Sequence, residues 1–146
     1  MTTTTPTELN ADERQILELH RGFVHANTNG DTDFLRAHMA PGAEGFRWYN
    51  LNKSIYVGMD HICRLWDFLA AMNSKGECPI LEEQIHVNGD MAMVTYLIDF
   101  KADFGPMGTA QMVARTTEIW ERLGGEWKMV HFHCSEHEPG GWEGGL

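Results

Sequence analysis

A single carboxylate interrupts the apolar side of an alternating segment at residues 109–122. The even-numbered positions from Ala110 to Trp120 are small or apolar, except for Thr116 and Glu118. Because an ionised carboxylate is costly to remove from water, a glutamate on such a face must be paired, protonated or close to an opening. When ionised it could accept a proton from a substrate, and when protonated it could donate a hydrogen bond. Glu118 is therefore the first candidate for acid or base chemistry.

The same glutamate has a structural interpretation. Glu118 could lie near a strand end and form a solvated ion pair with Arg47 or Arg115. Structural ion pairs perturb acidic residues as catalytic sites do. Both interpretations are open at the level of the sequence.

Arg47 and Tyr49 lie two residues apart in a short strand predicted near residues 46–50. A guanidinium fork and a phenol both suit a planar carboxylate or phenolate, so this pair could orient an oxygen anion beside Glu118. For Arg47 the alternative is an ordinary surface arginine on an edge strand.

Two further polar side chains fall on predicted core faces. His20 is on the apolar stripe of the first predicted helix, where it could act as a base toward a pocket. Its alternative is a buried histidine that is hydrogen-bonded to a backbone group. Tyr96 could offer its hydroxyl group to a ligand, or it could be an ordinary core aromatic residue.

A histidine-rich segment follows near the C-terminal end of the chain. His131 and His133 point to the same side of a strand, Glu136 and His137 follow, and imidazole suits zinc or iron. No standard ligand motif is complete, so we expect neither a metal nor another cofactor. Cys134 would be a nucleophile only with a base beside it.

The first half of the chain reads as helices. Residues 10–13 have the form of a capping box, and the apolar spacing after them predicts a helix to about residue 29. A short helix is predicted from Asp31 to about residue 39, and a third helix from Gly58 to about residue 72.

The second half reads as strands at residues 82–87, 91–104, 109–122 and 127–134. Helices followed by an antiparallel meander predict an α+β fold in which a strongly curved sheet wraps around the helices. Such a sheet encloses a pocket.

Composition excludes several classes of partner. The 146 residues contain 11 Lys and Arg against 21 Asp and Glu, a net charge of −10 that repels nucleic acid and acidic membrane surfaces. No apolar run is long enough to span a bilayer. The first residues lack a secretory signal, and the widely spaced Cys63, Cys78 and Cys134 suit free thiols, so we expect a cytoplasmic protein.

Five strings occur in a characteristic order: Asn29-Gly30-Asp31 and residues 85–90, 109–111, 116–120 and 125–133. With them the chain resembles the nuclear transport factor 2-like superfamily, in particular SnoaL-like proteins and the association domain of calcium/calmodulin-dependent protein kinase type II. The resemblance implies a cone-shaped α+β barrel, with a pocket between the helices and the concave face of the sheet. It also implies association through the outer face of the sheet.

The same resemblance gives the expected domain organisation. A single domain covers residues 10–135, between a flexible N-terminus at residues 1–9 and a glycine-rich tail at residues 136–146. It also implies that Phe132 and Cys134 point inward and that the histidines beside them point outward. In the kinase association domain the corresponding histidines are not a metal site.

At several positions this sequence differs from the functional residues of the related families, and these differences restrict the possible mechanisms. Phe23 stands where the resemblance places the oxyanion tyrosine of ketosteroid isomerases, and Arg47 stands where it places their general-base aspartate. Steroid isomerisation by that mechanism is therefore rejected. The two pocket arginines of the kinase association domain align with Glu118 and Cys134, so its ligand preference does not transfer directly.

Two functions are carried forward. The first is a cofactor-independent enzyme that performs isomerisation, dehydration or lyase chemistry on a small hydrophobic or aromatic molecule, with Glu118 as acid or base and with Arg47 and Tyr49 as orienting groups. The alternative is a non-catalytic hub that assembles as a homodimer or larger ring and senses a small ligand. The expected substrate-binding residues are His20, Phe23, Trp66, Tyr96, Phe100, Phe132 and Cys134.

Overall fold

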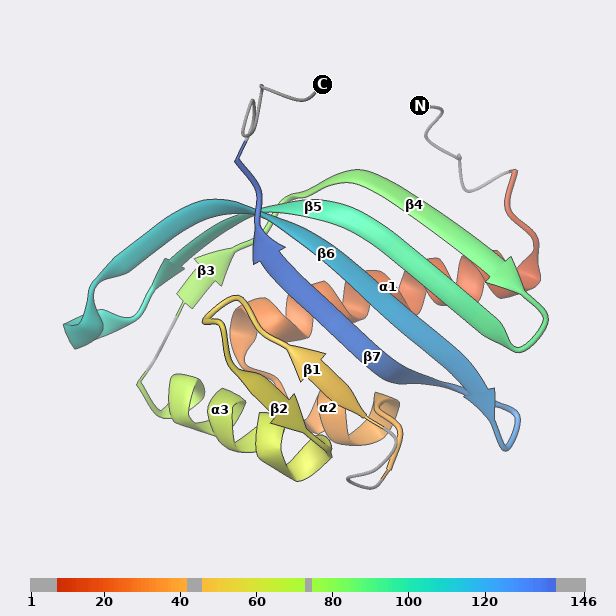
Figure 1. Cartoon of the computed structure of the whole chain (residues 1–146), viewed down its shortest axis with the longest axis horizontal. Coiled ribbons are helices and arrows are strands. Elements are labelled where there is room, and N and C mark those ends of the chain that lie inside the picture. The colour runs from red at the N-terminus through yellow and green to blue at the C-terminus, as the bar shows by residue number, and fades with distance from the viewer. Residues whose placement is uncertain (1–7, 42–45, 73–74, 139–146) are drawn as a thin grey trace.

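The computed structural model describes residues 8–41, 46–72 and 75–138 (Figure 1). Residues 1–7 and 139–146 of the two predicted flexible ends lie outside the described residues. Of the adjoining positions, Leu9 is buried, and Glu136 still belongs to the last strand.

Helix α1 spans Ala11–Asn29, and its capping box is formed as predicted. The side chain of Asn10 accepts from the backbone N–H of Glu13 at 2.9 Å, and the Glu13 carboxylate accepts from the backbone N–H of Asn10 at 2.9 Å. The helix ends at Gly30, whose φ of 65° suits a residue without a side chain. The buried face of α1 comprises Ile16, Leu17, His20, Phe23, Val24 and Ala26.

Helices α2 (Thr32–His38) and α3 (Met59–Ala71) follow at the predicted places. The N-cap of α2 is Asp31, whose carboxylate accepts from the backbone N–H of Phe34 at 3.3 Å. The hydroxyl group of Thr32 donates to the carboxylate of Asp67 at 2.6 Å, which ties α2 to α3.

Seven strands form one sheet in the order β2-β1-β7-β6-β5-β3, with β4 also paired to β5. The pair of β1 and β7 is parallel and the other pairs are antiparallel, so the sheet is mixed. Within the described residues it does not close on itself. The strands are β1 (Arg47–Tyr49), β2 (Ile55–Val57), β3 (Lys75–Glu77), β4 (Ile80–Asn88), β5 (Met91–Asp103), β6 (Thr109–Leu123) and β7 (Glu126–Glu136), with the short helix η1 (Gly105–Met107) between β5 and β6.

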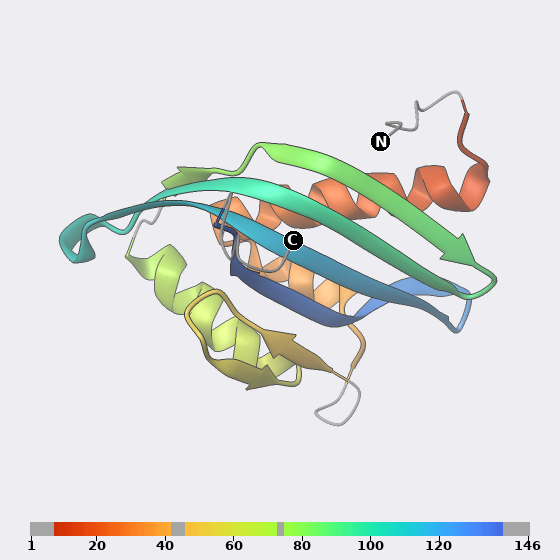
Figure 2. The same ribbon diagram turned by 45° about the horizontal axis from the view of Figure 1, so that its top comes forward.

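The long strands β4 to β7 arch over the helices, which lie together on one side of the sheet (Figures 1 and 2). This arrangement confirms the predicted cone-shaped α+β fold. Strands β2 and β3 were not predicted, because three residues are too few to show an alternating pattern. None of the described helices is long and apolar enough to cross a membrane.

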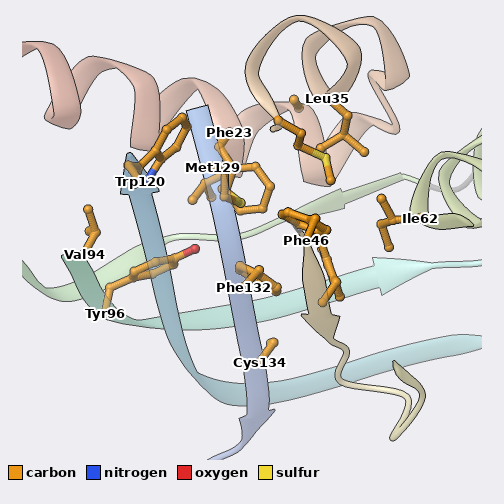
Figure 3. Close-up of a cluster of buried hydrophobic side chains, with 14 of the residues drawn as sticks. Phe23, Leu35, Phe46, Ile62, Val94, Tyr96, Trp120, Met129, Phe132 and Cys134 are labelled. Carbon is orange, nitrogen blue, oxygen red and sulfur yellow. The ribbon is translucent and has the colours of Figure 1, made fainter. Parts of the chain in front are cut away.

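Aromatic rings fill the space between the helices and the concave face of the sheet. Phe23 of α1 and Phe132 of β7 point toward each other with ring centroids 5.2 Å apart (Figure 3). Trp48 of β1 packs on Phe132 at 4.3 Å and on Trp66 of α3 at 5.9 Å. These rings are 1–2% exposed, so the cluster joins two helices to two strands in one core.

Candidate functional site

A cavity of about 440 Å³ lies between the C-terminal half of α1, helix α3 and the inner faces of β5, β6 and β7. This volume is within the usual range for small-molecule sites. Phe68 and Met107 line the cavity and are 53% and 60% exposed, so they mark its mouth between α3 and η1. The aromatic part of the wall consists of Trp48, Trp66, Phe68, Phe100, Phe104 and Phe132.

The wall of this cavity is uncharged. Among the described residues that line it, none is Asp, Glu, Lys, Arg or His. Burial raises the pKa of the Cys134 thiol to about 12 and also raises that of Cys78, so both thiols stay protonated near neutral pH. The remaining polar lining comes from Asn27, Thr28, Asn50 and Asn52. The cavity therefore offers ring contacts and neutral hydrogen-bonding groups.

Glu118 lies elsewhere, in a buried pair with His20. The Nδ1 of His20 is 2.6 Å from Oε2 of Glu118, and both side chains are 0% exposed. The indole N–H of Trp120 donates to Oε1 of the same carboxylate at 3.0 Å. Both oxygens of Glu118 thus have partners, and those partners are not the expected Arg47 or Arg115. His20 is likewise bonded to side chains and not to the expected backbone group.

A second carboxylate reaches His20 from strand β4. The Nε2 of His20 is 2.9 Å from Oε2 of Glu83, whose other oxygen accepts from Arg21 at 2.8 Å. The register of β4 against β5 shifts between Leu81 and Gln84, and Glu82 has a φ of 51° at this bulge. A bulge redirects the side chains of a strand, and here it accompanies the contact of Glu83 with α1.

The two carboxylates keep the imidazole charged. Burial alone would lower the pKa of His20, but the charges and hydrogen bonds of Glu118 and Glu83 outweigh it and raise that pKa to about 9. Burial would raise the pKa of Glu83, but hydrogen bonds from His20 and Arg21 lower it to about 2. At neutral pH an imidazolium therefore bridges two carboxylates, and both of its nitrogens donate.

Tyr96 belongs to this buried network. Its ring lies 4.4 Å from that of His20 in an edge arrangement. Burial, together with the charge of Glu118, raises the pKa of Tyr96 well above its usual value, so its hydroxyl group stays protonated. Ile98, the next residue on the same face of β5, lines the cavity, whereas Tyr96 does not.

The network and the cavity occupy neighbouring stretches of the same core. On α1, His20, Phe23 and Asn27 follow one another at intervals of about one turn, and of these only Asn27 lines the cavity. The ring of Phe23 packs against Trp48, Trp66 and Phe132, which do line it. Phe23 and its aromatic partners therefore lie between the two sites.

The structure brings together some of the predicted site residues. Trp66, Phe100, Phe132 and Cys134 line the cavity. His20 and Tyr96 join Glu118, and Phe23 packs against the cavity wall from behind.

Arg47 and Tyr49 are not brought to Glu118. They flank the buried Trp48 on β1 and are exposed on the opposite, outer face of the sheet. There the ring of Tyr49 lies 5.1 Å from His131 and 5.9 Å from His133. Across the part of the chain that the structure describes, no three His, Cys, Asp or Glu side chains are grouped so that they could hold a metal ion.

Sequence reasoning did not single out Glu83, Trp48, Asn27 or Asn50. For Asn27 a signal was available, because a polar residue stands at a helical interval on the apolar stripe that includes His20 and Phe23. For Glu83 there was none, because a bulge cannot be read from alternation. Trp48 and Asn50 lie at a strand too short for its inward face to be assigned.

Comparison with known proteins agrees with this architecture. A family profile described as a SnoaL-like domain matches residues 16–137. A candidate dehydratase of the NTF2-like family from Streptomyces avermitilis is 20% identical, with a TM-score of 0.75 over 92% of this chain and 99% of that chain. An NTF2-like superfamily protein from Salmonella enterica is 18% identical, with a TM-score of 0.78 over 92% and 96%.

A CaMKII hub from S. rosetta is 19% identical, with a TM-score of 0.69 over 93% of this chain and 100% of that chain. At these identities the solved structures establish the fold and leave the activity open. The family profile covers most of the described chain, including most of α1, all of α3, the cavity wall and the His20–Glu118 pair. The chain belongs to the SnoaL-like family, with the NTF2-like α+β fold.

Proposed function

We propose that this protein binds a small, uncharged, mainly apolar molecule with an aromatic ring in the cavity between α1, α3 and the sheet. The observation that carries this proposal is the composition of the wall, which combines six aromatic side chains with neutral polar groups. An aromatic wall favours flat ring systems through stacking and edge contacts. A charged ligand would lose its hydration on entering the cavity, and no opposite charge in the described wall would compensate for that loss.

The geometry favours binding over acid or base catalysis at Glu118. A catalytic carboxylate must reach the atom whose proton it moves. Glu118 is fully buried, has partners on both oxygens and is absent from the described lining of the cavity. In this proposal the His20–Glu118 pair supports the wall from behind, and the ligand contacts Trp66, Phe100, Phe132 and Cys134.

Fluorescence titration with 6-propionyl-2-dimethylaminonaphthalene, a neutral aromatic probe, tests the proposal. We expect saturable binding with a blue shift of the emission, and we expect Ala110→Phe to weaken binding at least tenfold because it fills the cavity. Gln111→Phe is the control, since the next residue of β6 points to the other face. Equal binding by the wild type and Ala110→Phe would reject the cavity as the site.

Self-association is a second candidate function. The outer face of the sheet carries exposed apolar side chains, which mark interaction surfaces when they gather. Structures described as CaMKII hubs are among the similar folds. The exposed apolar residues on this face include Tyr49, Ile55, Val57, Leu81, Met91 and Met93.

Light scattering coupled to size exclusion tests this second function. We expect a homodimer or a larger closed ring for the wild type, and dissociation on Tyr49→Glu. A wild-type monomer at all accessible concentrations would exclude the hub function and leave the binding proposal intact.

A further inference from the structure

The direction of the Asn50 amide in the cavity is determined by a neighbouring indole. Asn50 follows β1, and its side-chain Oδ1 accepts from the indole N–H of Trp48 at 2.8 Å. An indole N–H can only donate, so the oxygen of the amide must face it. The NH₂ group of Asn50 is therefore available as a hydrogen-bond donor. No described residue accepts from it.

Two hydrogen bonds also fix the backbone at Asn50. Its N–H donates to the carbonyl of Ser54 at 3.0 Å, and its carbonyl accepts from the N–H of Lys53 at 3.0 Å. Trp48 is 1% exposed within the aromatic cluster, so the group that orients the amide is itself fixed. Because the orientation of the Asn50 amide is already fixed, its NH₂ group loses little conformational freedom when it bonds to a ligand.

Asn27 adds a second amide from the helical wall. It lines the same cavity, is partly buried and has no side-chain hydrogen bond to any described residue. Asn52 differs from both, although it also lines the cavity. Its Oδ1 accepts from the N–H of Ser54 at 3.1 Å, and its NH₂ group donates to the hydroxyl of Tyr56 at 3.0 Å.

We propose that Asn50, assisted by Asn27, is the polar recognition element of the cavity and selects aromatic ligands that carry a neutral hydrogen-bond acceptor, namely a carbonyl oxygen. This inference rests on the proposed binding function and adds the ligand's functional group. A carbonyl accepts from the NH₂ group of Asn50 without bringing charge into the uncharged wall. A ligand of the same shape without the oxygen leaves that donor buried and unpaired, which costs affinity.

Two matched probes test the inference. 2-Acetonaphthone and 2-isopropenylnaphthalene have nearly the same planar shape, and only the first carries an acceptor. For the wild type we expect about fivefold tighter binding of the ketone, as for one additional neutral hydrogen bond. We also expect the carbonyl stretching band of the bound ketone to shift to lower frequency than in hexane.

The variant Asn50→Asp keeps the oxygen that accepts from Trp48 and removes the NH₂ donor. We expect it to lose the preference for the ketone and to return the carbonyl band toward its hexane position. Asn88→Asp, at an exposed amide of β4 that does not line the cavity, is the control and should keep both properties. If Asn50→Asp does not fold, the position of the carbonyl band of the ketone bound to the wild type still tests whether the ketone accepts a hydrogen bond.

The outcomes separate the two proposals. Binding of both probes with equal affinity and an unshifted carbonyl band would overturn the recognition role of Asn50 and leave the binding function standing. Failure of both probes to bind would overturn the binding function and, with it, this inference.

Discussion

The Nδ1 of His20 lies 2.6 Å from Oε2 of Glu118, although 98 residues separate the two positions and neither side chain has exposed surface. The contact joins α1 to β6 across the core. Removing one partner of such a pair leaves an uncompensated buried charge, which is far more costly than loss of a surface ion pair. The pair therefore determines how the protein responds to mutation and to pH.

Glu118→Gln removes the charge that faces the imidazolium while preserving shape. We expect it to lower the free energy of unfolding by about 3–5 kcal/mol, the range found when a buried pair is broken. Urea denaturation monitored by tryptophan fluorescence measures this loss. Glu121→Gln on the outer face of the same strand is the control, with an expected change within about 0.5 kcal/mol. A loss below 1 kcal/mol for Glu118→Gln would contradict the burial of a charged pair.

Stability should decline on the alkaline side of neutrality. The folded pKa of His20 is raised to about 9 from 6.5, so its contribution is complete below about pH 6.5 and is lost as the pH rises through 9. Urea midpoints measured between pH 6 and pH 10 show this decline. His20→Gln should flatten this part of the profile, and an unchanged profile in that variant would assign the decline to other groups.

Glu83→Gln tests the contribution of the β4 bulge. The variant removes one of the two carboxylates beside His20, so we expect the pKa of His20 to fall and the alkaline loss of stability to be smaller and to be complete at lower pH. The free energy of unfolding should fall by about 1–2 kcal/mol, because the side chain of Glu83 is 14% exposed and water partly replaces its partners. NMR titration of the His20 ring follows the pKa directly. Glu82→Gln, at the neighbouring exposed position of the bulge, should leave that titration unchanged.

The thiols of the cavity should react slowly and should report on its occupancy. Burial raises the pKa of Cys134 to about 12, whereas Cys78 is only partly buried, so we expect iodoacetamide at pH 8 to modify Cys78 first. Saturating 2-acetonaphthone should slow modification of Cys78 at least fivefold. Peptide mapping by mass spectrometry measures both rates, and protection without any detectable binding of the probe would indicate an indirect effect.

Local sequence patterns were sufficient for the helices and for the long strands. The capping box at Asn10 and Glu13 and the apolar stripe of α1 are set by residues three or four positions apart, and such short-range rules hold in any context. Alternation along β5 and β6 likewise identified the inward faces, including the buried position of Glu118. The NTF2-like fold and the SnoaL-like family were predicted in a different way, from the resemblance of short strings such as Asn29-Gly30-Asp31 to those of known proteins.

The contacts between elements were decided only by the tertiary structure. Three residues of β1 cannot show which face is inward, so pairing with β7 placed Trp48 in the core and turned Arg47 and Tyr49 outward. The bulge in β4 and the curvature of the sheet brought Glu83 and Glu118 to the two nitrogens of His20. The sequence by itself determined which residues are buried in the long elements. Which buried groups meet depended on strand register and sheet curvature, because these arise from the packing of the whole chain.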